Sequence, residues 1–416
     1  MPVQILLQRI SKPLFDMTKI LEVHEVQGLY GPLRIPEELI QRLWARRDFS
    51  EDRLRTVDGR AIRIHRVGTL NPNEGPDFLD ALIEIEGEIF RGDVEVHFRS
   101  RNWREHGHHL DPAFASVVLH LVLFPPVAGE TVAITTTGKR PVACALLEAM
   151  DCGLEEYAER EAIRQLGGVL ATNPFESLSR LSELERASRF REVAEMRWKH
   201  KVKLAAKRLG GTSWGDACHQ SLLEVLGYQR NRSPMASIAL HHPLGEFAEN
   251  SPDPDFLFLS RRTEWKLAGV RPANHPRTRL RQYCNLTSRI PDWPSRARAC
   301  SLDSFPGGER ETTARFRKRV NMPRKRDQLN FDSMGGAIGG GRFHTWVIDG
   351  LLPLAAADTG KELFAWWFHW YAGNAPECLS RLLRELGLTG KHAGSACNGW
   401  VQGGLGILTG DMPLVA

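Results

Sequence analysis

The chain has 416 residues, 42% of them hydrophobic and 25% charged, which is the composition of a soluble globular protein with two or three domains. No apolar run approaches the roughly 18 residues of a membrane span, and the N-terminal apolar run is too short for a signal peptide, so we expect a cytoplasmic protein. The seven cysteines are scattered and odd in number, which argues against a disulfide framework. The net charge of +5 allows nucleic-acid binding without requiring it.

The first predicted elements are a helix at 36–46 and a strand at about 61–67. Pro36 suits a first helical turn, and the apolar residues that follow it recur at helical spacing. A turn at Asp58-Gly59 precedes the strand. The helix is therefore expected to pack its apolar side against the sheet that begins here.

The next two strands are predicted on either side of a turn at Gly87. The second of them alternates apolar and polar residues, so its two faces differ. We expect the apolar face to be buried and the polar face to open to a common cleft. The apolar residues are Val94, Val96 and Phe98, and the polar residues are Asp93, Glu95 and His97.

A short helix beginning at Asp111 and a strand at 117–124 complete the predicted sheet region. The strand is apolar on both faces, so it should be central, with Leu119 and Leu121 buried. The order is helix, three strands, helix, strand. We therefore expect an α/β (α+β) fold with a mixed sheet in residues 1–130.

Residues 131–416 are predicted to form a mainly α-helical accessory region with basic loops. Helical spacing of apolar residues recurs along this part of the chain. The aromatic stretch at 364–373 is more typical of a core than of base stacking. The glycine-rich stretch at 335–341 lacks the lysine of a phosphate loop and should be a connector. The helical patterns lie at 181–209, 213–226, 234–248 and 375–387.

Two carboxylates form the first candidate site. Asp77 lies at the entry to one strand and Glu95 near the end of the next, 18 residues later, so a hairpin can bring them together. Paired carboxylates suit Mg²⁺ or Mn²⁺, which can activate water for phosphodiester hydrolysis. His97 should point into the same pocket. The alternative is a solvated polar strand face, which is the commoner origin of such alternation.

The sequence around these residues resembles a bacterial family of proteins of unknown function, the DUF2851 type. The shared pattern runs from "NxxGPDF" through "GDVEVH" to "DPxFxxVxLHLV", and the likeness continues thinly to the C-terminus. Asn102 departs from the pattern, since the family usually has Asp there. The resemblance implies no reaction. The matching residues are Glu38, Trp44, Asn73, Gly75, Pro76, Asp77, Phe78, Ala81, Gly92, Val94, Glu95, His97, Ser100, Trp103, His106, His108, Asp111, His120 and Val122.

A second, more distant resemblance does imply a reaction. Pro76-Asp77 followed by Glu95-x-His97 is similar to the PD-(D/E)XK motif of the restriction-endonuclease-like fold, whose core has the element order αβββαβ. The resemblance implies that Asp77, Glu95 and Glu38 hold the metal. His97 stands where these nucleases have lysine, and imidazole is a poorer phosphate clamp than ammonium. Arg99, two residues further, could supply that charge.

Five histidines between 97 and 120 form a second candidate site, because imidazole is a favoured ligand of Zn²⁺. Clustered histidines are also common as polar residues that pack on aromatic rings. His120, inside an apolar strand, is either a hydrogen-bonded core residue or a general base that faces the acids. The candidate zinc ligands are His97, His106, His108, His109 and His120.

Two basic segments, 261–281 and 315–326, make nucleic acid a plausible substrate. The alternative for each is a solvated loop. The second segment contains seven Lys or Arg and no acid, so it is the stronger candidate for phosphate contacts. Its proposed nucleic-acid contacts are Arg317, Lys318, Arg319, Arg324, Lys325 and Arg326.

We therefore expect a Mg²⁺- or Mn²⁺-dependent nuclease that cleaves DNA or RNA. Asp77, Glu95, His97 and His120 are its predicted catalytic residues. Two alternatives stay open: a non-catalytic nucleic-acid-binding protein on the same fold, and a zinc hydrolase built on the histidines.

Overall fold

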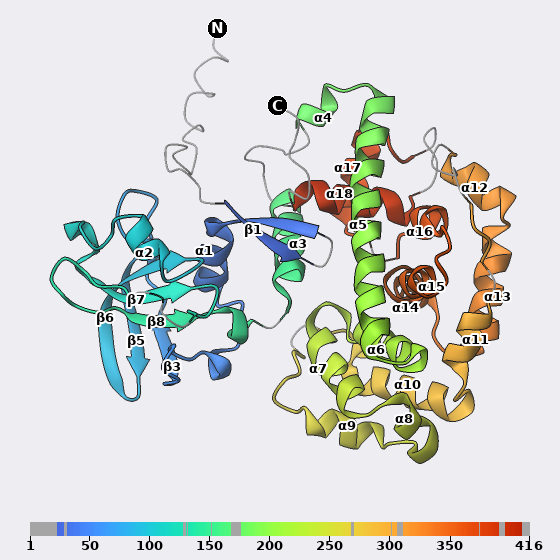
Figure 1. The fold of residues 1–416 in the computed structure, drawn as a ribbon, viewed down its shortest axis with the longest axis horizontal. Helices are drawn as coiled ribbons and strands as arrows, with labels where there is room; N and C mark the ends of the chain where they lie inside the picture. The colour runs from blue at the N-terminus through green and yellow to red at the C-terminus, as the bar shows by residue number, and fades with distance from the viewer. Residues whose placement is uncertain are drawn as a thin grey trace, which may run out of the picture. The chain divides into compact units, whose positions relative to one another are not determined.

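The structure is a computed structural model, and it forms two compact units. The sheet unit comprises Met1–Val26 and Arg34–Leu154, and the helical unit comprises Gln27–Leu33 and Glu155–Ala416 (Figure 1). The described residues are 23–28, 31–127, 130, 132–150, 152–167, 176–267, 270–300, 302–305, 311–373, 375–390 and 396–409.

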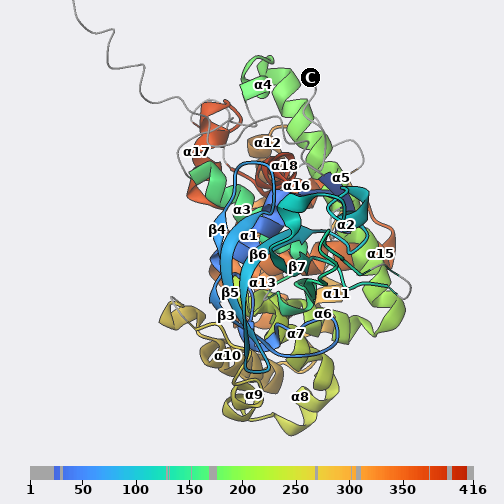
Figure 2. The ribbon, with the colours of Figure 1, turned by 90° about the vertical axis from the view of Figure 1, so that its left-hand side faces the viewer.

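A mixed six-stranded sheet forms the centre of the sheet unit, in the order β3-β5-β6-β7-β8, with β4 also paired to β5 (Figure 2). The first three strands of this order are antiparallel, and β6, β7 and β8 are parallel. A separate two-stranded sheet precedes it. The strands are β1 Val23–Gly28, β2 Gly31–Pro36, β3 Ile62–Arg66, β4 Thr69–Leu70, β5 Phe78–Ile85, β6 Glu88–His97, β7 Val117–Val122 and β8 Val142–Ala145.

The predicted helix is confirmed as α1, Glu37–Arg46, which buries Leu39, Ile40, Leu43 and Trp44. It ends because Arg47 adopts the left-handed conformation, with φ of 52°, and its N–H returns to carbonyls of the last turn. The short helix predicted at Asp111 is also confirmed. It is the 3₁₀ helix η2, Pro112–Phe114, and the Asp111 side chain accepts a hydrogen bond from Ala113 N.

The predicted core of the sheet is confirmed. The five side chains expected in it are fully buried, in agreement with the alternation along one strand and the two apolar faces of the next. In the parallel pair of β6 and β7, Val94 lies opposite Leu119 and Val96 lies opposite Leu121. The buried residues are Val94, Val96, Phe98, Leu119 and Leu121.

The expectation of an open polar cleft is wrong. Glu95 is only 5% exposed and His97 is not exposed at all. Asp93 lies apart from them, since its Oδ1 accepts a hydrogen bond from Asp80 N at 3.0 Å, where β5 has a register shift. The polar face of β6 is thus covered at Glu95 and His97. The residues that cover it include His106 and His108, two of the candidate metal ligands.

The strand β8 is not among the predicted elements, because "VACA" is short and is followed by helical patterns. It pairs in parallel with β7, as Leu121 opposite Cys144 illustrates. The sheet unit therefore extends to Leu154 and not to the predicted boundary at 130.

The helical pattern at 181–209, which allowed one helix or two, forms a single long helix, α5. A capping box of Ser182 and Glu185 starts it, because each side chain bonds to the other's backbone N–H. The pattern at 234–248 proves to be parts of two helices. The helices are α3 Leu154–Gly167, α4 Glu176–Ser179, α5 Glu183–Gly211, α6 Trp214–Leu226, α7 Tyr228–His241, α8 Leu244–Asn250, α9 Pro254–Ser260, α10 Pro276–Arg289, α11 Trp293–Ala299, α12 Thr313–Arg319, α13 Met322–Met334, α14 Gly340–Trp346, a π-helix Val347–Leu351, α15 Leu352–Thr359, α16 Phe364–His369, α17 Glu377–Glu385 and α18 Asn398–Leu408.

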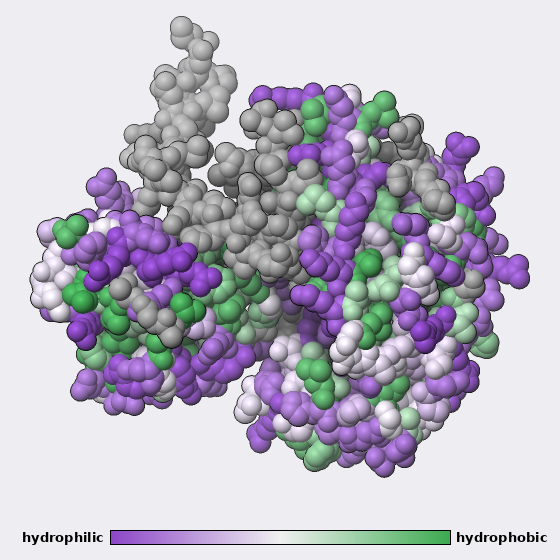
Figure 3. Space-filling view, in the orientation of Figure 1, coloured by the Kyte–Doolittle hydropathy of each residue, from purple (hydrophilic) through white to green (hydrophobic). Residues whose placement is uncertain are grey.

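The core of this unit is aromatic. The stretch at 364–373 provides Trp366, Trp367 and Phe368, all of them fully buried, which confirms the prediction of a core segment. On the face shown in Figure 3, hydrophilic residues cover most of the unit and apolar ones form small separate patches. Within the described ranges, no helix combines the length and the apolar character needed to cross a membrane.

Candidate metal centre

The structure brings Asp77 and Glu95 together, as the hairpin predicted. Phe78 lies opposite Val94 in the antiparallel pair, so the residues beside them, Asp77 and Glu95, are neighbours. The backbone N–H of Asp77 donates to Glu95 Oε2 at 3.1 Å. This hydrogen bond runs from the backbone at the start of β5 to a side chain of β6. It therefore fixes the position of the Glu95 carboxylate.

The carboxylate of Asp77 is occupied by protein donors. Its Oδ2 accepts a hydrogen bond from Val96 N at 3.0 Å, and its Oδ1 accepts one from Gln41 Nε2 at 2.9 Å. Asp77 is 3% exposed. Asp77 thus ties the start of β5 to β6 and to α1. Gln41 was not singled out from the sequence, where it is one polar residue on a helix.

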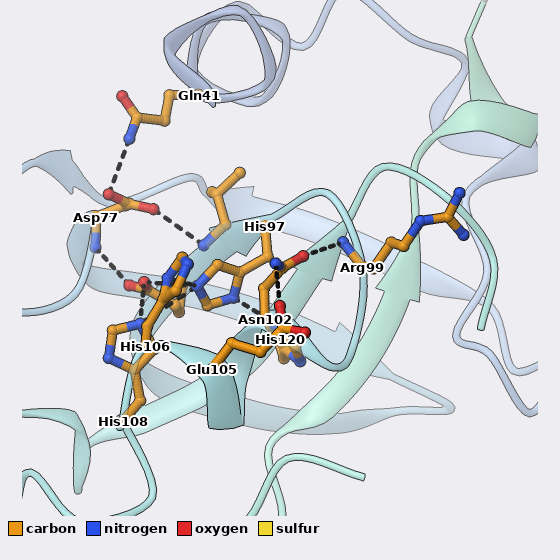
Figure 4. Close-up of polar contacts among 11 residues, drawn as sticks. Gln41, Asp77, His97, Arg99, Asn102, Glu105, His106, His108 and His120 are labelled. Atoms are coloured by element: carbon orange, nitrogen blue, oxygen red, sulfur yellow. Dashed lines mark hydrogen bonds and ion pairs between the residues drawn. The ribbon is translucent and has the colours of Figure 1, made fainter. Parts of the chain in front are cut away.

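Three histidines, His97, His106 and His108, lie close to one another (Figure 4). Two of them, His97 and His108, contact the Glu95 carboxylate. The Nε2 of His97 lies 3.0 Å from Nδ1 of His106 and 3.2 Å from Nε2 of His108. The Oε1 of Glu95 lies 3.2 Å from His108 Nε2 and 3.5 Å from His97 Nε2. The three histidines form the group of described residues whose ligand atoms are spaced to hold a metal ion.

These distances have the scale of a coordination sphere. Zinc binds imidazole nitrogen at about 2.0–2.1 Å, and in a tetrahedral site two ligand atoms are then about 3.3–3.4 Å apart. The four separations above, 3.0 to 3.5 Å, bracket that value, and the ligand nitrogens of the three histidines all lie within 4.8 Å of one another. The spacing therefore suits a transition-metal ion.

A tight turn after β6 brings His106 and His108 back over His97. Gly107 separates them and has φ of 79°, a left-handed conformation that a residue with Cβ adopts at a cost. Trp103, which is buried, anchors the turn by donating from Nε1 to the carbonyl of Ile134 at 3.0 Å. The backbone of this turn thus determines where both imidazoles point.

Asn102 stabilises the beginning of the same turn. Its Oδ1 accepts from Arg99 N at 2.9 Å, and its Nδ2 donates to Glu105 Oε2 at 2.9 Å. The first hydrogen bond ties Asn102 to the backbone just before the four-residue helix α2, Asn102–Glu105, and the second joins the first and last residues of that helix. The residue that departs from the family pattern therefore keeps a structural role here.

His120 lies on β7 in register with Glu95 of β6, and its ring contacts that of His97. Its Nε2 is 2.9 Å from Nδ1 of His97, and its ring is 1% exposed. Burial lowers the pKa of His120 to about 3, so the ring is neutral at physiological pH. When His97 Nε2 binds a metal, its Nδ1 carries the proton and donates to His120, which fixes the tautomer and the ring orientation.

Other predicted site residues make contacts of their own. Glu38 forms an ion pair with Arg42 one turn along α1, at 2.8 Å. The guanidinium of Arg99 lies over the ring of Phe124, 4.9 Å from its centre, and in Figure 4 it points away from the histidines. His109 is outside the group spaced for a metal ion. The structure thus selects three of the five candidate histidines.

The basic segment forms α12 and the start of α13, and several of its arginines are engaged. Arg317 donates to the carbonyls of His369, Trp370 and Ala396, and burial lowers its pKa. Arg319 pairs with Glu311 at 2.7 Å.

Arg326 pairs with Asp327 at 2.7 Å. Lys318 and Arg324 are exposed, while Lys325 is half-buried. Only part of the predicted phosphate-binding set therefore faces solvent.

A family model described as "Protein of unknown function (DUF2851)" matches residues 37–257, more than half of the chain. The match begins at α1 and includes the whole six-stranded sheet and the histidine turn. The chain belongs to this family. Neither a curated protein nor a solved structure matches it.

Proposed function

We propose that this DUF2851 protein is a metal-dependent hydrolase of nucleic-acid phosphodiester bonds, with a Zn²⁺-type ion held by His97, His106 and His108 beside Glu95. The convergence of three imidazole nitrogens at coordination distance carries the proposal. It favours the histidine-based zinc hydrolase over a purely carboxylate-bound Mg²⁺ site. Imidazole nitrogen suits zinc and other transition metals, whereas Mg²⁺ prefers oxygen ligands and keeps several waters.

The bound ion would supply two effects, a lowered pKa of a bound water and a polarised phosphate oxygen. The protein's own residues do the rest. Glu95, fixed by the N–H of Asp77, completes the ligand set or accepts the proton of the attacking water. His120 positions His97 and is not the general base, because a neutral ring whose pKa is about 3 takes up protons poorly.

The arrangement of the strands supports a nucleic-acid substrate. The motif Pro76-Asp77 with Glu95-x-His97 lies on an antiparallel β3-β5-β6 meander followed by the parallel strand β7, which supports a restriction-endonuclease-like core. Between β6 and β7, only the short helices α2 and η2 stand in place of a full helix. Phosphodiester hydrolysis is the reaction that this resemblance implies.

The second candidate is the Mg²⁺-dependent nuclease with Asp77 and Glu95 as ligands. Their adjacency favours it. However, both oxygens of Asp77 already accept hydrogen bonds, so a metal there would compete with Gln41 or with the Val96 N–H. The two sites differ in the role of His97, and that difference makes them separable by one substitution.

His97→Lys is that substitution. If His97 replaces the nuclease lysine, the variant keeps or raises activity. If His97 is a metal ligand, the variant loses both metal and activity, because an ammonium group has no lone pair to donate. The assay is cleavage of single- and double-stranded DNA and RNA, with the metal content of the same samples measured by mass spectrometry.

The metal centre itself is tested with His106→Ala and His108→Ala, and His109→Ala is the matched control on the same turn. We expect the first two proteins to purify with little zinc and to lose cleavage by on the order of 10²-fold or more. The control should keep both. Stoichiometric metal in all three variants would contradict the proposed ligands, and wild-type binding without cleavage would favour a non-catalytic nucleic-acid-binding protein.

A further inference from the structure

The helices α11 and α13 lie side by side along one edge of the helical unit, and a pocket of about 400 Å³ lies between them (Figure 1). Pockets of this size accommodate small organic groups. Leu302 and Leu329 form an apolar part of the wall, and both are buried. The polar part of the wall is made by Arg296, Lys325, Gln328 and Asp332.

Three of these polar side chains lie along one side of α13. Lys325, Gln328 and Asp332 are separated by three and four residues, which places them in one row on the helix. Phe331 lies one turn after Gln328, in the adjoining row, and is 72% exposed. Arg324 belongs to this adjoining row and is also exposed. The surface of α13 therefore runs from the pocket, past Gln328, to an exposed aromatic ring.

The helices α12 and α13 carry positive charge that the protein does not neutralise. Four of their basic side chains make no hydrogen bond or ion pair within the described part of the chain, whereas Arg317, Arg319 and Arg326 are engaged by protein groups. One acid of these helices, Asp332, also has no ion pair among the described residues. An anionic partner is therefore favoured. The four basic residues are Arg315, Lys318, Arg324 and Lys325.

The groups that accompany this charge favour nucleic acid over an acidic peptide. An exposed aromatic ring stacks on any nucleobase, because every base has a π-face. Glutamine matches the edge of adenine, and a carboxylate accepts from the amino group of cytosine. Gln328 and Asp332 are four residues apart and both line the pocket, so they present such groups together. A duplex hides the faces of its bases, so stacking on Phe331 requires a single strand.

We infer that the pocket between α11 and α13, together with Phe331, binds single-stranded nucleic acid. One base stacks on Phe331, and the next base enters the pocket beside Gln328 and Asp332. Arg324 and Lys325 contact the phosphates. The inference rests on the proposed phosphodiester hydrolase and names its substrate class, a single strand and not a duplex. The site lies within the helical unit, so binding does not require the metal.

The test is fluorescence anisotropy of the full chain in EDTA, which prevents cleavage at the proposed metal centre. The probes are labelled single-stranded DNA and RNA of about 15 nucleotides and duplexes of the same sequence. We expect a single strand to bind more tightly than its duplex, and Phe331→Ala to weaken it about tenfold or more, since one stacked base is lost. Phe256→Ala is the matched control and should bind like the wild type, because Phe256 is 60% exposed on α9 of the same unit.

Lys325→Gln tests the charge in the wall of the pocket. It should weaken binding and reduce the slope of log affinity against log salt by about 0.7, the value for one phosphate of a single strand. Arg262→Gln removes an exposed charge elsewhere in the helical unit, and it should leave the slope unchanged. Equal slopes in the Lys325→Gln variant and the wild type would contradict the proposed phosphate contact.

Cys300 reports on the pocket itself, because it lines the wall and is partly exposed. A bound strand should slow the alkylation of Cys300 and leave Cys378, on α17, as reactive as before, as measured by mass spectrometry of the peptides. Burial raises the pKa of the Cys300 thiol, so the reaction is run at alkaline pH. Equal alkylation of Cys300 with and without the strand would place the ligand outside the pocket and overturn the inference.

Three further results would overturn it: tighter binding of the duplex, unchanged affinity of Phe331→Ala, or binding of a polyglutamate peptide and of no oligonucleotide. These failures are distinct from failure of the proposed hydrolase. If the wild type cleaves nucleic acid and Phe331→Ala binds like the wild type, the hydrolase stands and this inference falls. If single strands bind through Phe331 and are not cleaved with zinc, this inference stands and the hydrolase falls.

Discussion

Gly107 lies between His106 and His108 and has φ of 79°, with no atom within 4 Å of the position that a Cβ would take. The space around it would admit alanine, so the backbone angle alone makes glycine the favoured residue. A single residue without a side chain is therefore what allows two neighbouring imidazoles to approach the same nitrogen of His97.

Gly107→Ala should destabilise the sheet unit by about 1–2 kcal/mol, the cost of a left-handed conformation for a residue with Cβ. It should also weaken metal binding, because the turn relaxes and moves both histidines. Urea unfolding and zinc titration with a competing chelator measure the two effects. Gly138→Ala is the control, since Gly138 has φ of 77° in another turn of the same unit and should cost stability without changing the metal.

His120→Gln should lower metal affinity by about 10- to 100-fold while it leaves the three proposed ligands in place. Gln offers His97 an acceptor on a more flexible side chain, whereas Leu offers none, so His120→Leu should lose more. Zinc titration of the wild type and of the His120→Gln and His120→Leu variants gives the order of their metal affinities. Equal affinity in all three would show that His120 is only a core residue.

Glu156 predicts a pH effect in the helical unit. Its pKa is raised to about 7 in the folded protein from 4.5, so the folded state holds this proton more tightly than the unfolded state. The contribution of Glu156 to stability is therefore present below pH 4.5 and is lost as the pH rises to about 7. Glu156→Gln should remove this loss, on the order of 2–3 kcal/mol, as seen by comparing urea unfolding at pH 4.5 and pH 8.

At the scale of elements, period-two alternation was the signal with the most structural content. It predicted β6, its buried apolar face and the adjacency of Asp77 and Glu95, because a strand offers only two faces. It did not predict that the polar face would be covered. The turn that carries His106 and His108 folds back over this face through tertiary contacts of Trp103, which a local pattern does not reveal. The sequence shows the histidines as a cluster, but which of them lie together depends on that turn.

The basic segment shows a second limit of sequence reasoning. Charge density identified Arg317 and its neighbours, but charge does not reveal which carbonyls lie within reach. Arg317 satisfies three carbonyl groups, at 2.9 to 3.1 Å, and lies over the ring of Tyr371. Lys318, on the same helix, is exposed. Two adjacent basic residues therefore differ, because Arg317 binds carbonyls of the protein whereas Lys318 faces solvent.

These roles predict different phenotypes. Arg317→Ala should lower the stability of the helical unit by roughly 1–3 kcal/mol, because the partly buried carbonyls of His369 and Trp370 lose their donor. Lys318→Ala together with Arg324→Ala should leave stability unchanged. If these two side chains bind nucleic acid, the double variant should also reduce the slope of log affinity against log salt, by about 0.7–0.9 for each phosphate that is no longer neutralised. An unchanged slope would show that the segment faces only water.

At the scale of the whole molecule, the proposed metal ligands all belong to the sheet unit. A ligand stabilises the unit that binds it by an amount that depends on its concentration and affinity. Zinc should therefore protect the sheet unit from proteolysis and leave cleavage within the helical unit unchanged. Limited proteolysis with and without zinc, followed by mass spectrometry of the fragments, measures both effects. Protection of fragments from the helical unit alone would contradict the proposed ligands.

The unequal exposure of the three histidines has a kinetic consequence, since His97 is buried whereas His106 is exposed and His108 is partly exposed. An ion between them would be reached from solvent on the side of His106, so it would exchange while His97 stays in place. Its residence time would then be set by movement of the His106 side chain and not by unfolding of the sheet. The protein would take up its metal after folding, and a wrong ion would remain replaceable.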